Sequence, residues 1–545
     1  MKQNNILSSA KMSSTVKKRK LDIAIIIALL AFSLFLHRGY FCLGLMTKGD
    51  WGFYFKEQMT PWFSPSYAWT REISISTMKI MWFTFYPINI VCGFLAKFFS
   101  FDFSIIERVL LFLPVAFLPA LSIYYLSSRL FKIRIACFFS AILYSSNTLI
   151  LTWSITWLPL AMAYSLIPLI LALFIQSLQE RSLRKAVLTS IIFAISMAYE
   201  SRITYITLWI LILYFLFINL SERSFSNFIH SLKIFASFMI TTITLQSYWV
   251  LAFFFGSGGE VFASRILSKP WISYGRLIHA ITLRYPWYTI IGEIRSFVVP
   301  PVNPIFLLIP IIAFSAILLR KKDKNAIFFL ILALIGIFLV KGENPPFGFI
   351  YTWLFKNFPG FNLYRDPLKL FPVIALGYSV LFGVAISDLG KIIGRRIKHQ
   401  SKSKIAVICF FTLVFSSQVI MAWPALAYQM KTYRGQDYFP SLPAPPEDYI
   451  EIKRFITEQP SGFRTLWLPD ISRFSFYSRE YPVIPIEKQT ERLSQSDITI
   501  LSNFIILPDV SSDYFSRLLA AWNIKYVILS PENELDPLYE RFPQE

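Results

Sequence analysis

The sequence has few charged residues, few cysteines and no glycine-rich nucleotide motif. Only 16% of its 545 residues are Asp, Glu, Lys or Arg, whereas 55% are hydrophobic, a balance that no soluble domain needs for its core. The 4 cysteines have no metal-ligand spacing, which argues against a zinc domain. The absence of a phosphate-binding glycine motif argues against a nucleotide-driven pump. A membrane protein is the class that fits this composition.

Long hydrophobic runs occupy most of the first 428 residues. A helix needs about 20 residues to cross the ~30 Å hydrocarbon core of a membrane. Eleven runs are apolar enough to be candidates, and they predict an all-α polytopic membrane protein with about 11 transmembrane helices. The predicted spans are 21–36, 105–126, 135–152, 157–177, 186–199, 203–220, 234–255, 304–319, 326–340, 370–389 and 405–428.

The positions of Lys and Arg agree with this count. With a cytoplasmic N-terminus, the inner loops carry 24 Lys and Arg together, and the second and third outer loops carry only Arg202. This bias follows the positive-inside rule. It predicts a multi-pass plasma-membrane protein whose C-terminus is extracytoplasmic. The apolar run 81–99 would reverse the bias if it spanned, so we expect it to lie on or dip into the outer interface.

The net charge of +21 does not indicate nucleic-acid binding. Residues 431–545 contain 12 basic and 17 acidic residues, so the excess of positive charge lies in the membrane part and mostly on its inner loops. Membrane topology and anionic lipid headgroups account for that distribution. Membrane lipids are therefore expected partners, and nucleic acid is not.

The chain is predicted to contain two parts. Residues 1–428 form the transmembrane module with a long first outer loop at 37–104, and residues 429–545 form a small extracytoplasmic α/β domain. In this domain, helices are expected from Glu447 onward and at 511–522, and strands at 464–469 and 525–530. Cys42 and Cys92 share the first outer loop, where they form either a disulfide or two unpaired thiols.

The first outer loop contains acidic residues among aromatics. Asp50 follows Gly49 shortly after the first span, and Tyr54, Glu57 and Glu72 lie further along the loop. An ionised carboxylate is able to take a proton from an attacking hydroxyl or to bind Mg²⁺ or Mn²⁺. We predict Asp50 as the base, with a metal as a possible cofactor there, and Tyr54 and Glu57 as substrate-binding residues. The alternative for Asp50 is a helix cap.

Two further clusters of charged residues lie at the predicted outer ends of transmembrane helices. Glu200 and Arg202 join two short spans, so they are expected in a polar cavity, as a catalytic and a binding residue, or simply as an ion pair. Arg365 and Lys369 flank Pro367 at the start of the tenth predicted span. These two cations are predicted to bind a phosphate group, and the alternative is snorkelling at the membrane surface.

These features together resemble the GT-C superfamily of membrane glycosyltransferases, which use polyprenyl-phosphate-linked sugars. The likeness consists of Gly49-Asp50 just past the first span, many spans, and an outer C-terminal domain. Arg365-Asp366-Pro367-Leu368-Lys369 resembles an Arg-(Glu/Asp)-Pro-x-Lys element of bacterial and archaeal branches, and 463–469 and 522–528 resemble their tail signatures. The resemblance implies that Asp50 is the loop-one base or metal ligand and that Arg365 holds the carrier phosphate.

The predicted function is transfer of a sugar from a polyprenyl-phosphate carrier to an extracytoplasmic glycan, lipid or protein acceptor. The segment 153–156 lacks the acidic pair of oligosaccharyltransferases, and the tail lacks their Trp-Trp-Asp-Tyr-Gly signature, which argues against peptide asparagine as the acceptor. Two alternatives remain open, a lipid or sugar transporter and a non-catalytic scaffold of cell-envelope assembly. A transporter is expected to place its polar residues near the membrane midplane in two related halves.

Overall fold

A computed structural model describes most of the chain. The descriptions below concern all residues except 1, 43, 46–51, 65–68, 71–76, 79–83, 132, 223, 256–274, 287, 289–301, 428–443, 469–473, 479, 485–511 and 530–545. Contacts divide the chain into two compact units, which are described separately. Unit 1 comprises Met1–Cys42, Arg108–Leu251 and Gly259–Phe439, and unit 2 comprises Leu43–Glu107, Ala252–Gly258 and Pro440–Glu545. The predicted boundary at 428 and 429 stays a prediction.

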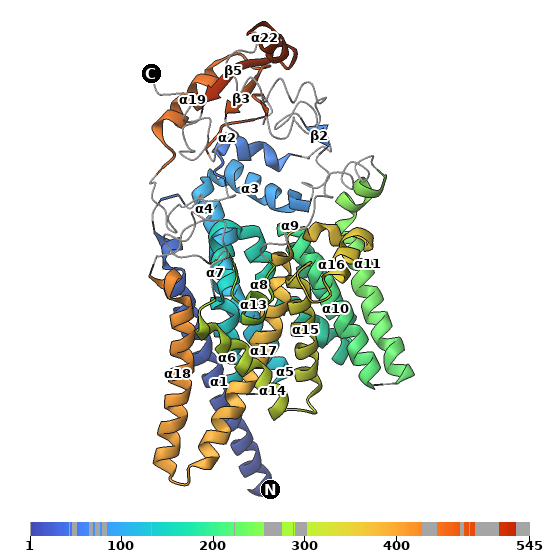
Figure 1. The fold of residues 1–545 in the computed structure, drawn as a ribbon, viewed down its shortest axis with the longest axis vertical. Coiled ribbons are helices and arrows are strands. Elements are labelled where there is room, and N and C mark those ends of the chain that lie inside the picture. The colour runs from blue at the N-terminus through green and yellow to red at the C-terminus, as the bar shows by residue number, and fades with distance from the viewer. Residues whose placement is uncertain are drawn as a thin grey trace. The chain divides into compact units, whose positions relative to one another are not determined.

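Unit 1 is a bundle of helices (Figure 1). The described residues of the eleven predicted runs are almost entirely helical, although the runs 105–126, 135–152 and 304–319 each extend over more than one helical element. Its elements are α1 (Lys2–Leu36), η1 (Arg38–Phe41), η4 (Arg108–Phe112), α5 (Leu113–Leu130), α6 (Arg134–Ser146), α7 (Thr148–Thr156), α8 (Leu158–Gln179), α9 (Leu183–Tyr199), α10 (Ser201–Glu222), most of α11 (Phe225–Phe255), α13 (Leu277–Thr282), η6 (Pro304–Leu307), α14 (Leu308–Leu319), α15 (Lys324–Val340), α16 (Gly348–Asn357), η7 (Phe361–Tyr364), η8 (Pro367–Leu370), α17 (Phe371–Arg396) and α18 (Gln400–Leu426).

The helices fit a membrane protein. Among the described residues, six helices are long and apolar enough to cross a membrane, or seven if α6 and α7 count as one span. Two of the other predicted spans, at α14 and α15, are shorter apolar helices. The exact number of eleven spans therefore stays a prediction.

Helix α17 lies at the centre of unit 1, where it packs against α6, α14 and α15 (Figure 1). All of its most apolar window is buried. Glycines allow this close packing: a Cβ at Gly383 would overlap the carbonyl of Ala136, and one at Gly377 would lie 2.9 Å from the carbonyl oxygen of Phe329. Small residues at helix contacts are the usual means by which membrane helices approach one another.

The predicted third span is bent rather than straight. Helices α6 and α7 meet at 45°, and Asn147 lies between them. Its side-chain oxygen accepts hydrogen bonds from the backbone N–H groups of Leu149 and Ile150, at 3.1 and 3.3 Å. This N-cap competes with continuation of the first helix. The segment 153–156, expected as an outer loop, consequently lies in or at the end of α7, where Trp153 is buried.

Short elements cover one end of unit 1. α15 ends at Val340, and α17 begins at Phe371. Between them, α16, η7 and η8 lie at the end of the bundle where α10 begins (Figure 1). Asp366 is the N-cap of η8, because its carboxylate accepts a hydrogen bond of 3.0 Å from the N–H of Leu368. This arrangement brings the sequence around Arg365 and Lys369 to the same end as Glu200 and Arg202.

Unit 2 contains a small parallel sheet and the helices around it. Its elements are α2 (Lys56–Met59), η2 (Thr60–Phe63), β1 (Trp69–Thr70), β2 (Thr77–Met78), α3 (Tyr86–Phe99), α4 (Phe103–Glu107), α19 (Glu447–Glu458), β3 (Arg464–Leu468), β4 (Val483–Ile484), α22 (Ser512–Ala521) and β5 (Ile524–Leu529). The sheet has the order β4-β3-β5, and both strand pairs are parallel. The predicted α/β character of the C-terminal region is confirmed.

The first loop contributes to the core of unit 2. Phe55, from the loop, is buried in the same hydrophobic cluster as Tyr449 of α19 and Trp467 of β3. The rings of Tyr449 and Trp467 are stacked with centroids 6.0 Å apart. Helix α3, within the run predicted to lie at the interface, is 14 residues long and rises about 21 Å, less than a membrane core. Its location at a membrane surface stays a prediction.

Candidate functional site

Two of the predicted clusters meet at one end of unit 1. The hydroxyl of Tyr364 donates a hydrogen bond of 2.7 Å to the carbonyl oxygen of Arg202. The charges of Arg202, Asp366 and Lys369 are close enough to influence one another. Residues some 160 positions apart in the sequence therefore form a single charged cluster. Arg365 lies beside it as an exposed residue.

Glu200 and Arg202 form the ion pair that the sequence allowed. The guanidinium donates two hydrogen bonds to the carboxylate, Nε to Oε1 at 2.6 Å and Nη2 to Oε2 at 2.7 Å. Glu200 is only 3% exposed, and the backbone N–H of Arg202 also donates to it, at 3.2 Å. A bidentate pair of this kind fixes both side chains. Both side-chain oxygens of Glu200 therefore already have hydrogen-bond partners.

Lys369 differs from Arg202 in having no such partner. Within the described residues, its ammonium makes no hydrogen bond and no ion pair, although Asp366 lies near it. The carboxylate of Asp366 is engaged as the cap of η8. Burial raises the pKa of Asp366, and the positive charge of Lys369 opposes this effect. Lys369 is thus a half-buried cation whose hydrogen-bonding capacity remains for a ligand.

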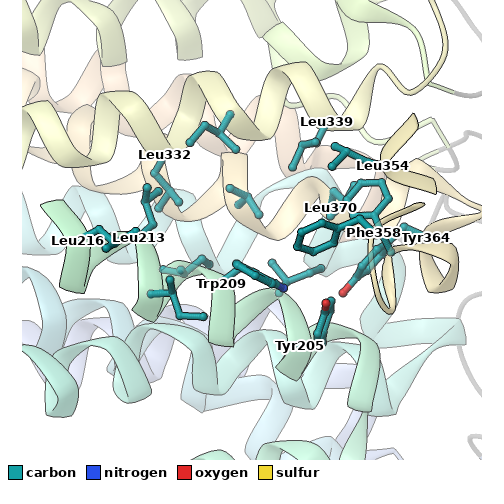
Figure 2. A pocket seen from close by; sticks show the side chains of 16 residues that line it. Tyr205, Trp209, Leu213, Leu216, Leu332, Leu339, Leu354, Phe358, Tyr364 and Leu370 are labelled. Atoms are coloured by element: carbon teal, nitrogen blue, oxygen red, sulfur yellow. The ribbon is translucent and has the colours of Figure 1, made fainter. Parts of the chain in front are cut away.

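An apolar groove lies beside this cluster. It has a volume of about 290 Å³ and is formed by α10, α15, α16, η7 and the start of α17. Figure 2 shows the aromatic rings of Tyr205 and Phe358 toward one end, Trp209 near the middle, and aliphatic side chains such as Leu213 and Leu216 at the other end. From Tyr205 to Leu216 the helix rises about 17 Å. The groove therefore has the form of a long hydrophobic channel next to a group of cations.

The end of the groove near the cations is closely packed. The hydroxyl of Tyr205 donates a hydrogen bond to the carbonyl oxygen of Pro359 at 2.5 Å. Gly360 has a φ of +74°, and a Cβ at this position would lie 3.2 Å from the Tyr205 ring. Glycine avoids both the strain and the crowding. The tyrosines Tyr205 and Tyr364 lie together at this end (Figure 2), with ring centroids 6.3 Å apart.

The predicted residues of the first outer loop belong to unit 2 or lie outside the described residues. Asp50 and Glu72 lie outside the described residues. Glu57 forms an ion pair with Lys453 of α19 at 2.7 Å. Tyr54 packs its ring against Trp62 and Phe103, and burial raises its pKa. The roles of Asp50, Tyr54 and Glu57 in a reaction stay predictions.

The described residues do not fit a divalent metal. No group of three or more His, Cys, Asp or Glu is found among them in an arrangement that would hold an ion. The oxygens of Glu200 and Glu57 are occupied by Arg202 and Lys453. Cys42 and Cys92 are free thiols and belong to different units, so the two alternatives for this pair stay predictions.

No pattern in the sequence predicts the groove. Its walls come from α10, α15 and the segment from α16 to α17, which no sequence period brings together. Trp209 and Phe358 appear in the sequence as ordinary apolar residues of a span and a loop. The one available signal was the concentration of aromatic residues near Arg365, at Phe358, Phe361 and Tyr364.

Comparisons with known proteins identify the fold. No protein-family model matches the chain, and a search of curated proteins finds no match. Among solved structures, arabinofuranosyltransferase AftD from mycobacteria is similar to it with a TM-score of 0.63 and 13% identity. The similarity covers 94% of this chain and 36% of AftD, so the chain spans about a third of that protein's length.

The archaeal oligosaccharyltransferase AglB from Archaeoglobus fulgidus is also similar. Its structure with an inhibitory peptide and a dolichol-phosphate gives a TM-score of 0.54 at 11% identity, covering 94% of this chain and 69% of AglB. The complex of the A. fulgidus enzyme with zinc and sulfate gives 0.51 at 13% identity, covering 93% and 68%.

The chain therefore shares its fold with AftD and AglB, which are GT-C glycosyltransferases. The predicted fold class, an all-α membrane protein with a small α/β region, is confirmed. At these identities the likeness shows the fold, and neither the Arg-Asp-Pro-x-Lys element nor any single site residue is tested by it.

Proposed function

We propose that this protein transfers a sugar from a polyprenyl-phosphate carrier to an acceptor outside the plasma membrane. The observation that carries the proposal is the apolar groove that runs along α10 and is lined by Tyr364 and Leu370, the chain neighbours of Arg365 and Lys369. A polyprenyl phosphate has the same two parts, a long hydrocarbon chain and a terminal anion. The dolichol-phosphate in the AglB complex supports this type of donor.

The cations would bind the phosphate at the end of the groove. Lys369 makes no hydrogen bond or ion pair within the described residues, and Arg365 is exposed beside it. Arginine is able to grip two phosphate oxygens at once, and lysine adds a compact charge. Arg202 contributes positive charge nearby while Glu200 fixes its orientation. We therefore assign Glu200 a positioning role in addition to its predicted catalytic one.

The chemical step would be a direct displacement at the anomeric carbon. The acceptor hydroxyl forms a new C–O bond, and the bond between the anomeric carbon and the phosphate oxygen breaks. The electron pair of that bond leaves with the polyprenyl phosphate, where Arg365 and Lys369 stabilise the charge. Asp50 takes the proton of the acceptor hydroxyl as general base. The acceptor is a glycan, a lipid or a protein, and the sugar is a hexose or a pentose.

A divalent cation at Asp50 remains part of the proposal. Mg²⁺ or Mn²⁺ would supply an electrophile that draws charge away from the departing phosphate. Because the described acids do not fit such a site, no step above depends on it. Loss of transfer on addition of a chelator, with recovery on addition of Mn²⁺, would establish the requirement.

The proposed orientation places the N-terminus in the cytoplasm and the groove's charged end at the outer surface. It is tested by a C-terminal fusion to a reporter that needs the reducing cytoplasm. We expect this reporter to be silent and an N-terminal fusion to be active. Activity of the C-terminal fusion would mean that one predicted span is miscounted.

The function itself is tested by an assay of transfer. The purified protein in lipid nanodiscs is incubated with radiolabelled polyprenyl-phosphate pentoses and hexoses and with a cell-envelope extract as acceptor. Labelled product is expected for one donor, and polyprenyl phosphate without sugar should compete. A scaffold would bind no donor, whereas a transporter would move the intact donor across vesicle membranes without forming product.

A further inference from the structure

The outward side of α16 is an unusual surface for a helix that does not span. Phe347 immediately before the helix, Phe349 and Trp353 are 63%, 71% and 58% exposed. Phe349 and Trp353 are four residues apart and therefore lie on one side of the helix. The opposite side is packed, because Tyr351 and Phe355 are buried. Large exposed aromatics gathered in this way mark a surface that contacts something other than water.

The position of α16 in the chain indicates what that surface contacts. The helix lies between the end of α15 at Val340 and the start of α17 at Phe371, and both of these helices are apolar. The segment between them consequently lies near the boundary of the hydrocarbon core. Tyrosine and tryptophan, with apolar neighbours, collect at this level of membrane proteins. Lys356 is exposed at the end of the same side, where its ammonium would reach the headgroups.

The aromatic side of α16 also adjoins exposed apolar side chains of α10. Phe358, just after the helix, packs against Trp209 of α10 with ring centroids 5.1 Å apart. Trp209 is 41% exposed, and Leu216 further along α10 is exposed as well. Leu354, next to Trp353, lines the groove. Thus α16 separates the groove on its inner side from the surroundings on its outer side.

We infer that α16 is an interfacial membrane anchor, with Phe347, Phe349 and Trp353 inserted into the lipid leaflet at this end of the bundle. A short amphipathic helix lies in the plane of the interface with its apolar side at the boundary between headgroups and acyl chains. The inference concerns contact with the bilayer and does not require the protein to be an enzyme. Its ligand is the lipid surface, and a protein that covers α16 is the competing outcome.

Fluorescence quenching tests this inference in the full-length protein. Cys42 and Cys409 are the exposed cysteines and are replaced by serine. Phe349→Cys and Trp353→Cys are then labelled separately with an environment-sensitive dye in phosphatidylethanolamine and phosphatidylglycerol vesicles. A label on Glu451→Cys, an exposed position of α19, serves as the aqueous control. Cys409 in α18, retained in a separate preparation, serves as the reference for a span.

The expected result is strong quenching at 349 and 353 by lipids that carry a nitroxide near the headgroup. Quenching by lipids with a nitroxide deep in the chain should be weaker there than at Cys409, and aqueous iodide should act mainly on the Glu451→Cys label. Quenching of 349 and 353 by iodide to the same extent as the control would overturn the inference. Protection from both iodide and nitroxide lipids would also overturn it, because the surface would then be covered by protein.

The unaltered protein provides a second measurement that does not depend on the folding of the cysteine variants. In nanodiscs containing a lipid with a photoactivatable group near its headgroup, illumination should attach lipid to the peptide that contains 347–356. Absence of lipid from this peptide, with lipid present on peptides of α18, would contradict the inference.

Discussion

Two ion pairs, one in each unit, show how differently the same charges are used. Glu200 and Arg202 in unit 1 are joined by two short hydrogen bonds, and the carboxylate is almost fully buried. Glu57 and Lys453 in unit 2 are joined by one contact of 2.7 Å, and the Glu57 side chain is 54% exposed. The first pair lies beside an apolar groove and further cations, whereas the second links a loop helix to α19.

The two ion pairs differ in how much the fold depends on them. A buried carboxylate without its cation would be very costly, so Arg202 is needed wherever Glu200 is buried. An exposed pair contributes little, because water solvates either partner when the other is removed. Unit 1 therefore carries a charge arrangement that its fold depends on, next to the proposed donor site. Unit 2 carries the loop sequence in which the proposed base, Asp50, is located.

The largest effect is expected for Asp50, which would make unit 2 essential to the chemistry. Asp50→Asn retains size and most hydrogen bonding but cannot accept the proton, so the rate of transfer should fall by about 10²- to 10⁴-fold. Glu451→Gln, another acidic position in unit 2, is the matched control. Thermal stability should be unchanged, and donor binding should persist. If Asp50 is a helix cap instead, asparagine serves equally well, and full activity of Asp50→Asn would remove the assignment.

The next largest effect should come from breaking the buried pair. Arg202→Met leaves Glu200 buried without a cation, which is expected to lower the free energy of unfolding by ~3 kcal/mol, the low end for such pairs because Arg202 is partly exposed. The double variant Glu200→Gln with Arg202→Met should recover most of this loss. Unfolding followed in increasing concentrations of denaturing detergent measures both. Equal stability of Arg202→Met and the wild type would show that water reaches Glu200.

These pairs also show where sequence reasoning succeeded. Glu200 and Arg202 are two residues apart, so their pairing was predictable from local spacing alone, and it is confirmed. The partner of Glu57 is Lys453, almost 400 residues away, and no local pattern points to it. The helices followed from hydrophobic runs, but the bend at Asn147 depends on hydrogen bonds of one side chain. The groove required three separate segments to be placed together.

A smaller effect is expected at the proposed phosphate site. Arg365→Ala removes a charge-assisted interaction of ~1.5 to 3 kcal/mol, which corresponds to roughly a ten- to hundredfold loss of donor affinity. Arg365→Lys should recover only part of it, because the bidentate geometry is lost. Binding of radiolabelled polyprenyl phosphate in nanodiscs measures the change. Arg396→Ala, which removes an exposed cation from the last turn of α17, is the control. Unchanged affinity in Arg365→Ala would identify Arg365 as a surface anchor.

The smallest effect should come from the exposed pair of unit 2, and it should depend on pH. Partial burial acts to raise the pKa of Glu57, but the hydrogen bond from the Lys453 ammonium, a backbone hydrogen bond and the positive charges of Lys453 and Lys56 together hold the pKa below the ordinary value of 4.5. A carboxyl whose pKa is lower in the folded state stabilises the fold above its unfolded pKa and loses this contribution as the pH falls through the folded pKa. Near pH 7, Glu57→Gln should therefore cost ~0.2 to 1 kcal/mol.

As the pH falls below the lowered pKa of Glu57 in the folded protein, the difference between Glu57→Gln and the wild type should disappear, because both side chains are then neutral. Thermal unfolding of the full-length protein near pH 7 and at this lower pH measures the difference. Glu451→Gln is the control, because Glu451 is exposed and forms no ion pair with another described residue. A loss near pH 7 as large as that in Arg202→Met would mean that the Glu57 pair is shielded from water in the intact protein. The comparison between the two units would then fail, because both pairs would be buried.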